Sequence, residues 1–246
     1  MKILKKKKTI IIICVIAVLA VLLIQPARYI IAMTSMRTLP TQEVMTDIYS
    51  IKASLSNIYL LKSGDKYIAF DAGGSEKEAK SALEDLGINE KDVIALFLTH
   101  TDYDHVAAVP LFTSAEIYMA ESNKTYIESK AGHSRSSAFV KMEKDCITML
   151  DGEVITIADT EIQCIFTPGH TDGSASFVVN GKYLIAGDNL NLKDGKAVLF
   201  FSIFNTDKDE QARSIRSLAK LEGIEAIFTM HTGYTTDFKT AFSEWE

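Results

Sequence analysis

Four of the five histidines in this chain, together with three nearby aspartates, follow short apolar runs that are typical of β-strands. The apolar runs are 93–98, 162–166, 183–186 and 226–228. The polar residues that follow them are His100, Asp102, Asp104, His105, His170, Asp188 and His231. A rigid scaffold presents chemistry best where a strand ends and a loop begins. We therefore expect a fold in which these strand ends converge on one polar site.

The residue types at these positions indicate a metal site. A pair of divalent ions needs neutral imidazoles and ionised carboxylates from several segments, with positions left open for water and substrate. The segment 100–105 alone could instead be an ordinary polar turn, with Thr101 or Asp104 as the N-cap of a helix over 106–112. The histidines and the aspartate further along the chain favour the metal site.

Five blocks of the sequence, in this order, resemble the motifs of the metallo-β-lactamase superfamily of hydrolases. The blocks are Tyr67–Gly73, His100–His105, Pro168–Ser174, Gly187–Asp188 and His231. The resemblance extends over residues 45–246 and implies an α/β fold, a four-layer αββα sandwich of two mixed sheets with helices outside. It also implies two divalent metal ions as cofactors, with zinc as the expected metal.

The resemblance gives each candidate residue a role. The implied ligands of the first metal ion are His100, Asp102 and His170. The implied ligands of the second are Asp104, His105 and His231, and Asp188 would bridge the two ions. Asp71, at the end of an apolar run, would support the metal-binding loop without touching an ion, and Asp104 would also orient the nucleophile.

Asp102 departs from the family pattern His-x-His-x-Asp-His, which has a histidine at this position. An aspartate is a harder, anionic ligand, so it shifts the preference from zinc towards manganese, iron or magnesium. With three ionised aspartates, two divalent ions leave one net positive charge, and bound water is acidified less strongly than with two aspartates. If Asp102 does not reach a metal, only the second ion is tightly held.

A similar His-x-Asp-x-Asp-His pattern occurs in the metallo-β-lactamase domains of DNA-uptake proteins, which raises the alternative of a nuclease or phosphodiesterase. Charge counts against it. Residues 1–37 contain seven basic and no acidic residues, so the rest of the chain carries 19 basic against 32 acidic residues. Such a field repels nucleic acid, and no cluster of Lys or Arg follows residue 37. We expect a small-molecule or envelope-derived substrate.

The N-terminal residues predict a membrane anchor. Lys5–Lys8 precede an uncharged apolar segment, 9–24, that could lengthen towards Ile31. We expect a cytoplasmic basic tail over 1–8, a transmembrane signal anchor over 9–31, a linker over 32–44 and the hydrolase domain over 45–246. Basic residues before the apolar segment would place the catalytic domain of this single-pass protein on the extracytoplasmic side of the cell membrane. The alternative is a cleaved signal peptide.

Within the domain, strand and helix patterns alternate. Strands are expected over 44–51, 57–62 and 67–70. Helices are expected over 75–86, 207–221 and 237–245. The sequence does not indicate an oligomeric state.

Four aromatic residues are weaker candidates for the site. Tyr234, three residues after His231, is a candidate substrate contact or proton donor. Phe200, Phe201 and Phe204 would form either a hydrophobic wall over the site, part of the core or a lipid-facing patch.

Three other residues are not assigned to the site. His133 lies in a polar stretch and is expected to be a solvated loop residue. Cys146 and Cys164 could form a disulfide outside the cell, but their spacing does not indicate one.

The expected activity is that of a membrane-anchored metal-dependent hydrolase. A metal-bound hydroxide would attack an ester, lactam, thioester or phosphodiester bond. An extracytoplasmic location would argue against glutathione thioesters, which are mainly cytosolic. A non-catalytic metal-binding or sensing domain is the second hypothesis, and the six other intact candidate ligands count against it.

Overall fold

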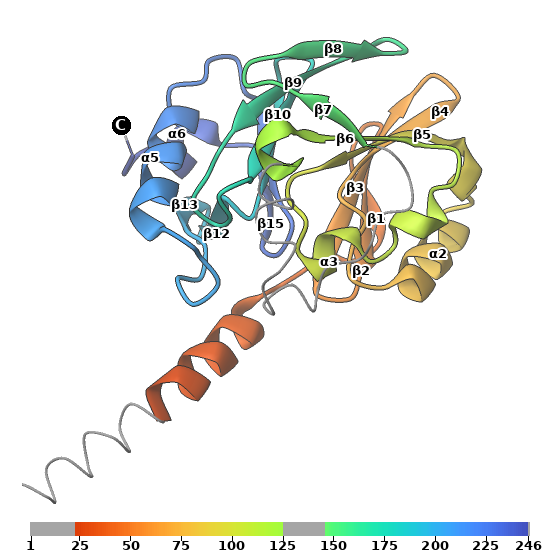
Figure 1. Ribbon diagram of the computed structural model, residues 1–246. Coiled ribbons are helices and arrows are strands. Elements are labelled where there is room, and N and C mark those ends of the chain that lie inside the picture. Colours follow the sequence, from red (N-terminus) through yellow and green to blue (C-terminus); the bar gives the residue numbers. More distant parts are fainter. Residues whose placement is uncertain (1–22, 125–145, 246) are drawn as a thin grey trace, which may run out of the picture. The chain divides into compact units, whose positions relative to one another are not determined.

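The computed structural model describes residues 23–124 and 146–245, and it divides the chain into two compact units, 1–36 and 37–246 (Figure 1). In the first unit, residues 23–35 are helical. The second unit contains all the strands and the remaining helices described below.

The predicted localisation in the cell membrane is wrong. No helix within 23–124 or 146–245 is long and apolar enough to span a bilayer. Residues 9–22 of the predicted anchor and Lys5–Lys8 lie outside the described residues.

The first sheet has seven strands in the order β1-β2-β3-β4-β5-β6-β7. They are β1 (Gln42–Met45), β2 (Ile48–Ala53), β3 (Ser56–Ser63), β4 (Lys66–Phe70), β5 (Val93–Leu98), β6 (Glu116–Ala120) and β7 (Cys146–Met149). Strands β1 to β4 pair antiparallel, and β4 to β7 pair parallel. Because β4 and β5 are parallel neighbours, Asp71 and His100 leave the sheet at the same edge.

The second sheet has six strands in the order β15-β14-β11-β10-β9-β8. They are β8 (Val154–Ile157), β9 (Thr160–Phe166), β10 (Ala175–Val179), β11 (Tyr183–Gly187), β14 (Ala226–Thr229) and β15 (Gly233–Thr235). Strands β9, β11 and β14 run in one direction, since β9 and β11 both pair antiparallel with β10 and β11 pairs parallel with β14. The loops that carry His170, Asp188 and His231 therefore share an edge. A separate hairpin pairs β12 (Leu190–Lys193) with β13 (Lys196–Leu199).

Three hydrophobic clusters separate four layers, which confirms the predicted αββα sandwich. The cluster between the sheets includes Phe70, Phe97, Phe177 and Phe228. A second cluster lies under α2 (Glu76–Asp85), and a third under α5 (Lys208–Leu218) and α6 (Phe238–Phe242). The same unit contains α3 (Tyr103–Val106) and the 3-10 turns η1 (Glu90–Asp92) and η2 (Val109–Leu111), and residues 121–124 are helical.

Strand β5 shows why both faces of the central strands are apolar. Ala95 and Phe97 enter the cluster between the sheets, whereas Leu96 and Leu98 pack in the cluster that includes α2. Alternate side chains of a strand point to opposite faces, so a strand covered on both sides reads as a continuous apolar run.

The predicted helices and strands are present with shifted ends. The run 44–51, predicted as one strand, is the hairpin β1–β2, which turns at Asp47 with a φ of 63°. The predicted helix 75–86 is α2, where the Ser75 side chain accepts a hydrogen bond from the backbone N–H of Glu78. The predicted helix 207–221 is α5, which begins after the N-cap Asp207.

Candidate metal centre

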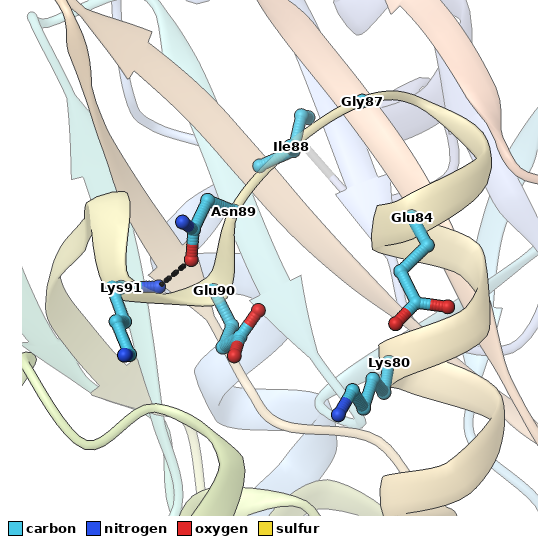
Figure 2. A pocket seen from close by; sticks show the side chains of 7 residues that line it. All are labelled: Lys80, Glu84, Gly87, Ile88, Asn89, Glu90 and Lys91. Carbon is cyan, nitrogen blue, oxygen red and sulfur yellow. Dashed lines mark hydrogen bonds between the residues drawn. The ribbon is translucent and has the colours of Figure 1, made fainter.

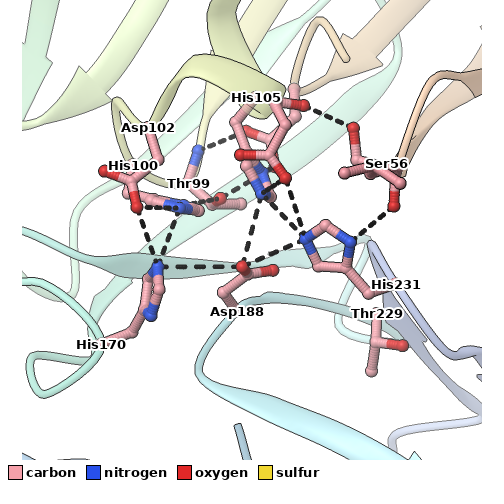
Figure 3. Close-up of polar contacts among 12 residues, drawn as sticks. Ser56, Thr99, His100, Asp102, His105, His170, Asp188, Thr229 and His231 are labelled. Carbon is pink, nitrogen blue, oxygen red and sulfur yellow. Dashed lines mark hydrogen bonds and ion pairs between the residues drawn. The ribbon is translucent and has the colours of Figure 1, made fainter. Parts of the chain in front are cut away.

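The seven predicted ligands lie together at the end of the two sheets where β5, β9, β11 and β14 finish. Figure 3 labels six of them, all except Asp104. His100 and Asp102 follow β5, and Asp104 and His105 lie in α3. Asp102 occupies the N-cap position of α3, but its side chain makes no capping hydrogen bond. Instead, its Oδ2 atom lies 3.3 Å from Nε2 of His170. The interpretation of this segment as a simple helix cap is therefore not supported.

Three groups of three side chains each have their ligand atoms within 4.8 Å of one another. Two of them are the first metal set, His100, Asp102 and His170, and the second metal set, Asp104, His105 and His231. The third group, His100, His105 and Asp188, takes one histidine from each set. The first and second metal sets are the groupings that the family resemblance implies.

Asp188 lies between the two sets. Its Oδ2 atom is 3.2 Å from Nε2 of His231, 3.4 Å from Nε2 of His105 and 3.7 Å from Nε2 of His170. The other carboxylate oxygen, Oδ1, is buried and has no hydrogen-bond partner among the described residues. A buried carboxylate oxygen without a partner is costly unless a cation compensates it.

The tautomers of His105 and His231 follow from the atoms behind each ring. Nδ1 of His105 lies 2.8 Å from Oδ2 of Asp71, and Nδ1 of His231 lies 2.7 Å from the carbonyl oxygen of Leu55. Both oxygens accept hydrogen bonds, so each Nδ1 carries the proton and each Nε2 presents a lone pair to the site.

His100 has the same tautomer. The Thr99 hydroxyl lies 2.8 Å from Oδ2 of Asp71 and donates its one hydrogen there. Its oxygen therefore accepts the hydrogen bond from Nδ1 of His100, 3.0 Å away. Nε2 of His100 is left with a lone pair that faces Nε2 of His170.

These paired lone pairs fit a divalent ion. The Nε2 atoms of His105 and His231 are 3.2 Å apart, as are those of His100 and His170. Two imidazoles bound tetrahedrally to zinc at about 2.0–2.1 Å have their nitrogens roughly 3.4 Å apart. Two lone pairs at such a distance repel unless a cation, either a proton or a metal ion, lies between them.

The charges of the side chains agree with this fit. Burial raises the pKa of Asp188, but His231 and His105 outweigh burial and hold that pKa well below its usual range. Burial lowers the pKa of His105, but Asp188, Asp71 and Asp104 outweigh it and hold the pKa well above its usual value. Protons and metal ions thus compete for the same Nε2 atoms.

His100 differs from the other three histidines. Burial, followed by the neighbouring His105 and His170, lowers the pKa of His100 to about 4. Its Nε2 atom is therefore available to a metal ion at neutral pH, without first losing a proton.

Asp71 supports both sets of ligands. It is fully buried, and its carboxylate accepts hydrogen bonds from the backbone N–H and hydroxyl of Thr99 and from Nδ1 of His105. Thr99 in turn packs against Gly187, where an added Cβ would lie 2.7 Å from Cβ of Thr99. Glycine at 187, with a φ of 58°, thus allows the Asp188 loop to approach the His100 loop.

Phe200 forms an apolar wall beside both sets of ligands. Its ring centroid lies 4.9 Å from that of His170 and 5.5 Å from that of His231, and only 3% of the residue is exposed. Phe201 and Phe204 pack on Phe200 at 5.2 and 6.1 Å and are partly exposed. Of the three placements considered for this cluster, the structure supports the wall over the site.

Tyr234 is placed differently from its predicted role. Its hydroxyl donates to the carbonyl oxygen of Val44 at 3.0 Å, and its ring stacks on Phe228 in the cluster between the sheets. Its hydroxyl is thus engaged by Val44 and its ring by Phe228, so Tyr234 has no part in the proposed mechanism. Cys164 is a buried free thiol, so it forms no disulfide with Cys146. His133 lies outside the described residues.

A surface hollow of about 440 Å³ lies elsewhere, between the end of α2 and η1 (Figure 2). It is open to solvent, and its lining includes Lys80, Glu84, Asn89, Glu90 and Lys91. None of the seven predicted ligands lines it. The convergent histidines and carboxylates therefore identify the candidate site better than the size of the hollow does.

Several residues of the site were not predicted from the sequence. Thr99 precedes His100 directly, and a threonine at a strand end beside a ligand is a usable signal. Leu55 contributes only a backbone carbonyl, which no side-chain pattern reveals. Asn205, which lies 35 residues after His170 in the sequence, accepts a hydrogen bond from Nδ1 of His170 at 3.2 Å. The sequence around Asn205 does not indicate this contact.

Comparison with known proteins agrees with this geometry. The family model described as the metallo-beta-lactamase superfamily matches residues 51–231. The probable metallo-hydrolase YqgX of Bacillus subtilis is 27% identical over 143 residues, which are 55% of this chain and 66% of the relative. A hydroxyacylglutathione hydrolase of Vibrio campbellii is 28% identical over 192 residues, 76% of this chain and 66% of that enzyme. The chain thus spans just under two thirds of the length of these relatives.

A solved structure shows the same fold. The crystal structure of a metallo-beta-lactamase family protein from Thermus thermophilus has a TM-score of 0.62 and 22% sequence identity, and the match covers 82% of this chain and 78% of that chain.

Proposed function

This chain belongs to the metallo-β-lactamase superfamily of hydrolases, and on that premise we propose that it cleaves an acyl bond, an ester, thioester or lactam, with two divalent metal ions. The observation that carries the proposal is the pair of ligand sets joined by Asp188, each with two facing Nε2 atoms. Zinc is the proposed metal, with manganese or iron as the alternative that Asp102 favours.

Some residues of the chain would hold the metal ions, and others would position the attacking water and the substrate. The two metal sets would hold divalent ions, which would polarise the scissile oxygen and lower the pKa of water. The side chains of Asp102 and Asp104 are 46% and 31% exposed, against 4% for Asp188, so the substrate enters beside Asp102 and Asp104. Asp104 accepts a hydrogen bond from the attacking water and orients it towards the carbonyl carbon. Phe200 excludes bulk water from the side of His170 and His231.

Charge supports an acyl bond over a phosphodiester. The acidic excess after residue 37 disfavours a polyanionic substrate. The relative named hydroxyacylglutathione hydrolase supports including thioesters. Glutathione thioesters are among the candidate substrates, because the predicted membrane location that disfavoured them is wrong.

Metal content is the first test. We expect the full chain, purified without chelator, to carry between one and two divalent ions, and chelation to abolish hydrolysis in a panel of ester, thioester, lactam and phosphodiester substrates. Zinc, manganese and iron added back singly would identify the active metal. Asp159→Ala, an exposed carboxylate at the turn between β8 and β9, is the matched control and should change neither result. Absence of bound metal after incubation with all three ions would refute the proposal that the protein is a metal-dependent hydrolase. Activity confined to phosphodiesters would refute the proposal that it cleaves an acyl bond.

Asp102 allows a second test. Asp102→His should keep two ions, raise the preference for zinc over manganese and shift the pH profile of hydrolysis to lower pH, because a neutral ligand leaves the ions more acidifying. Asp102→Ala should lose the first ion and keep the second. Equal metal content and equal pH dependence in the wild type and Asp102→Ala would show that Asp102 is not a ligand.

A further inference from the structure

Two amide side chains connect the first metal set to the bridging aspartate. Gln211, in helix α5, is completely buried, and its Nε2 atom donates to the backbone carbonyl of Asp188 at 3.1 Å. Asn205, in the loop before α5, lies between Gln211 and His170. We propose that Asn205 and Gln211 are positioning residues that fix the tautomer of His170 and hold it in register with Asp188. This inference rests on the proposed metal-dependent function.

The orientation of each amide follows from its neighbours. A backbone carbonyl only accepts, so the NH₂ group of Gln211 points to Asp188 and its Oε1 points to Asn205. Oε1 also only accepts, so the NH₂ group of Asn205 donates to it, at 2.7 Å, and also to the carbonyl of Phe200, at 3.1 Å. Oδ1 of Asn205 is then the atom that faces Nδ1 of His170.

His170 is thereby fixed in one tautomer. Because Oδ1 of Asn205 accepts, Nδ1 of His170 carries the proton and Nε2 offers its lone pair to the first metal set. The backbone of Asp188 thus determines the tautomer of His170 through two side chains. Among the residues that the structure describes, no carboxylate accepts from Nδ1 of His170, whereas Asp71 accepts from Nδ1 of His105.

We call the hydrogen-bonded series from Asp188 through Gln211 and Asn205 to His170 the relay. The backbone around the relay is tightly packed. Gly169, next to His170, has a φ of 133°, and a Cβ added to it would lie 2.2 Å from the backbone nitrogen of Gln211. The N–H groups of Thr206 and Asp207 donate to the carbonyls of His170 and Gly169, both at 2.9 Å. The start of α5 and the His170 loop therefore keep a fixed distance, which the relay requires.

The relay also orders the apolar wall. Asn205 holds the carbonyl of Phe200, whose ring packs against His170. Removing the Asn205 amide should therefore affect the orientation of His170 from two sides.

The test compares three variants of the full chain loaded with zinc. Asn205→Ala removes the acceptor for His170, and Asn205→Asp keeps an acceptor there. Asp207→Ala is the matched control, because it removes the N-cap side chain of the same helix, which accepts from the N–H groups of Asp209 and Glu210, and leaves the relay intact. Zinc affinity is measured by competition with a chromophoric chelator, and the Nδ1 proton of His170 by NMR.

For Asn205→Ala we expect a roughly 10- to 100-fold loss of affinity for one of the two zinc ions and loss of the His170 Nδ1 proton signal through fast exchange with water. Asn205→Asp should recover the His170 Nδ1 proton signal but only part of the affinity, because a carboxylate accepts from His170 and cannot donate to Oε1 of Gln211 or to the carbonyl of Phe200. Asp207→Ala should retain both the zinc affinity and the His170 signal. This should hold even if, without metal, the melting temperatures of Asp207→Ala and Asn205→Ala are lowered by the same amount.

Equal zinc affinity and an unchanged His170 signal in Asn205→Ala and the wild type would overturn the relay, as would equal losses in Asn205→Ala and Asp207→Ala. If Asn205→Ala does not fold, Gln211→Leu replaces it, with the same outcomes expected at smaller size. A wild-type chain that binds no zinc would instead refute the proposed function, so the two failures are distinguishable.

Discussion

Asp71→Asn is expected to lower kcat/KM by on the order of 100- to 10,000-fold while leaving the fold intact. Asparagine has the shape of aspartate and tolerates the positive φ of 58° at this position. Its NH₂ group, however, donates where the carboxylate accepts from His105 and Thr99. His105 must then carry its proton on Nε2, and the lone pair that faces the second metal set is lost.

The measurements are steady-state kinetics, metal content and thermal unfolding of the same preparation. Asp92→Asn is the matched control, because Asp92 forms a half-exposed ion pair with Lys66 and its replacement should cost little stability and no activity. Asp71→Asn with wild-type metal content and activity would show that the tautomer of His105 is not set by Asp71.

Asp188→Ala is expected to remove most of the stabilisation that metal ions give the protein. An ion present at about 1,000 times its dissociation constant stabilises the fold by about 4 kcal/mol. Because Oδ2 of Asp188 lies within 3.7 Å of histidines from both sets, its loss weakens both positions. The melting temperature of the variant should therefore respond little to zinc, whereas that of the wild type should rise clearly.

Unfolding curves with chelator and with excess zinc test this expectation, and Asp159→Ala should behave as the wild type. A full zinc response in Asp188→Ala would mean that each metal set holds its ion without the shared carboxylate.

The sequence predicted the layered fold and the clustering of the candidate ligands because both depend on local patterns. Apolar runs ending in His or Asp mark buried strands that deliver polar residues to one edge. The hairpin at Asp47 was missed because the residues 44–51 read as one strand, and a positive φ at an aspartate is not visible in that pattern.

Contacts between distant segments could not be predicted in this way. The backbone carbonyl of Leu55 accepts the hydrogen bond that orients His231, and a residue of any type at position 55 could make this contact. Tyr234 illustrates the opposite difficulty. It is close to His231 in sequence, but β15 pairs back along β14 and carries its ring into the core.

The origin of the ligands has a consequence for folding. Each metal set takes two residues from the first sheet's β5–α3 segment and one from a loop of the second sheet, separated by 70 residues in one set and 126 in the other. Contacts of such high contact order form late, after the chain has lost the entropy of closing long loops. Neither sheet alone supplies all the ligands of either ion. Metal ions are therefore expected to bind only after the two sheets have packed together. Bound ions should then slow unfolding much more than they speed folding.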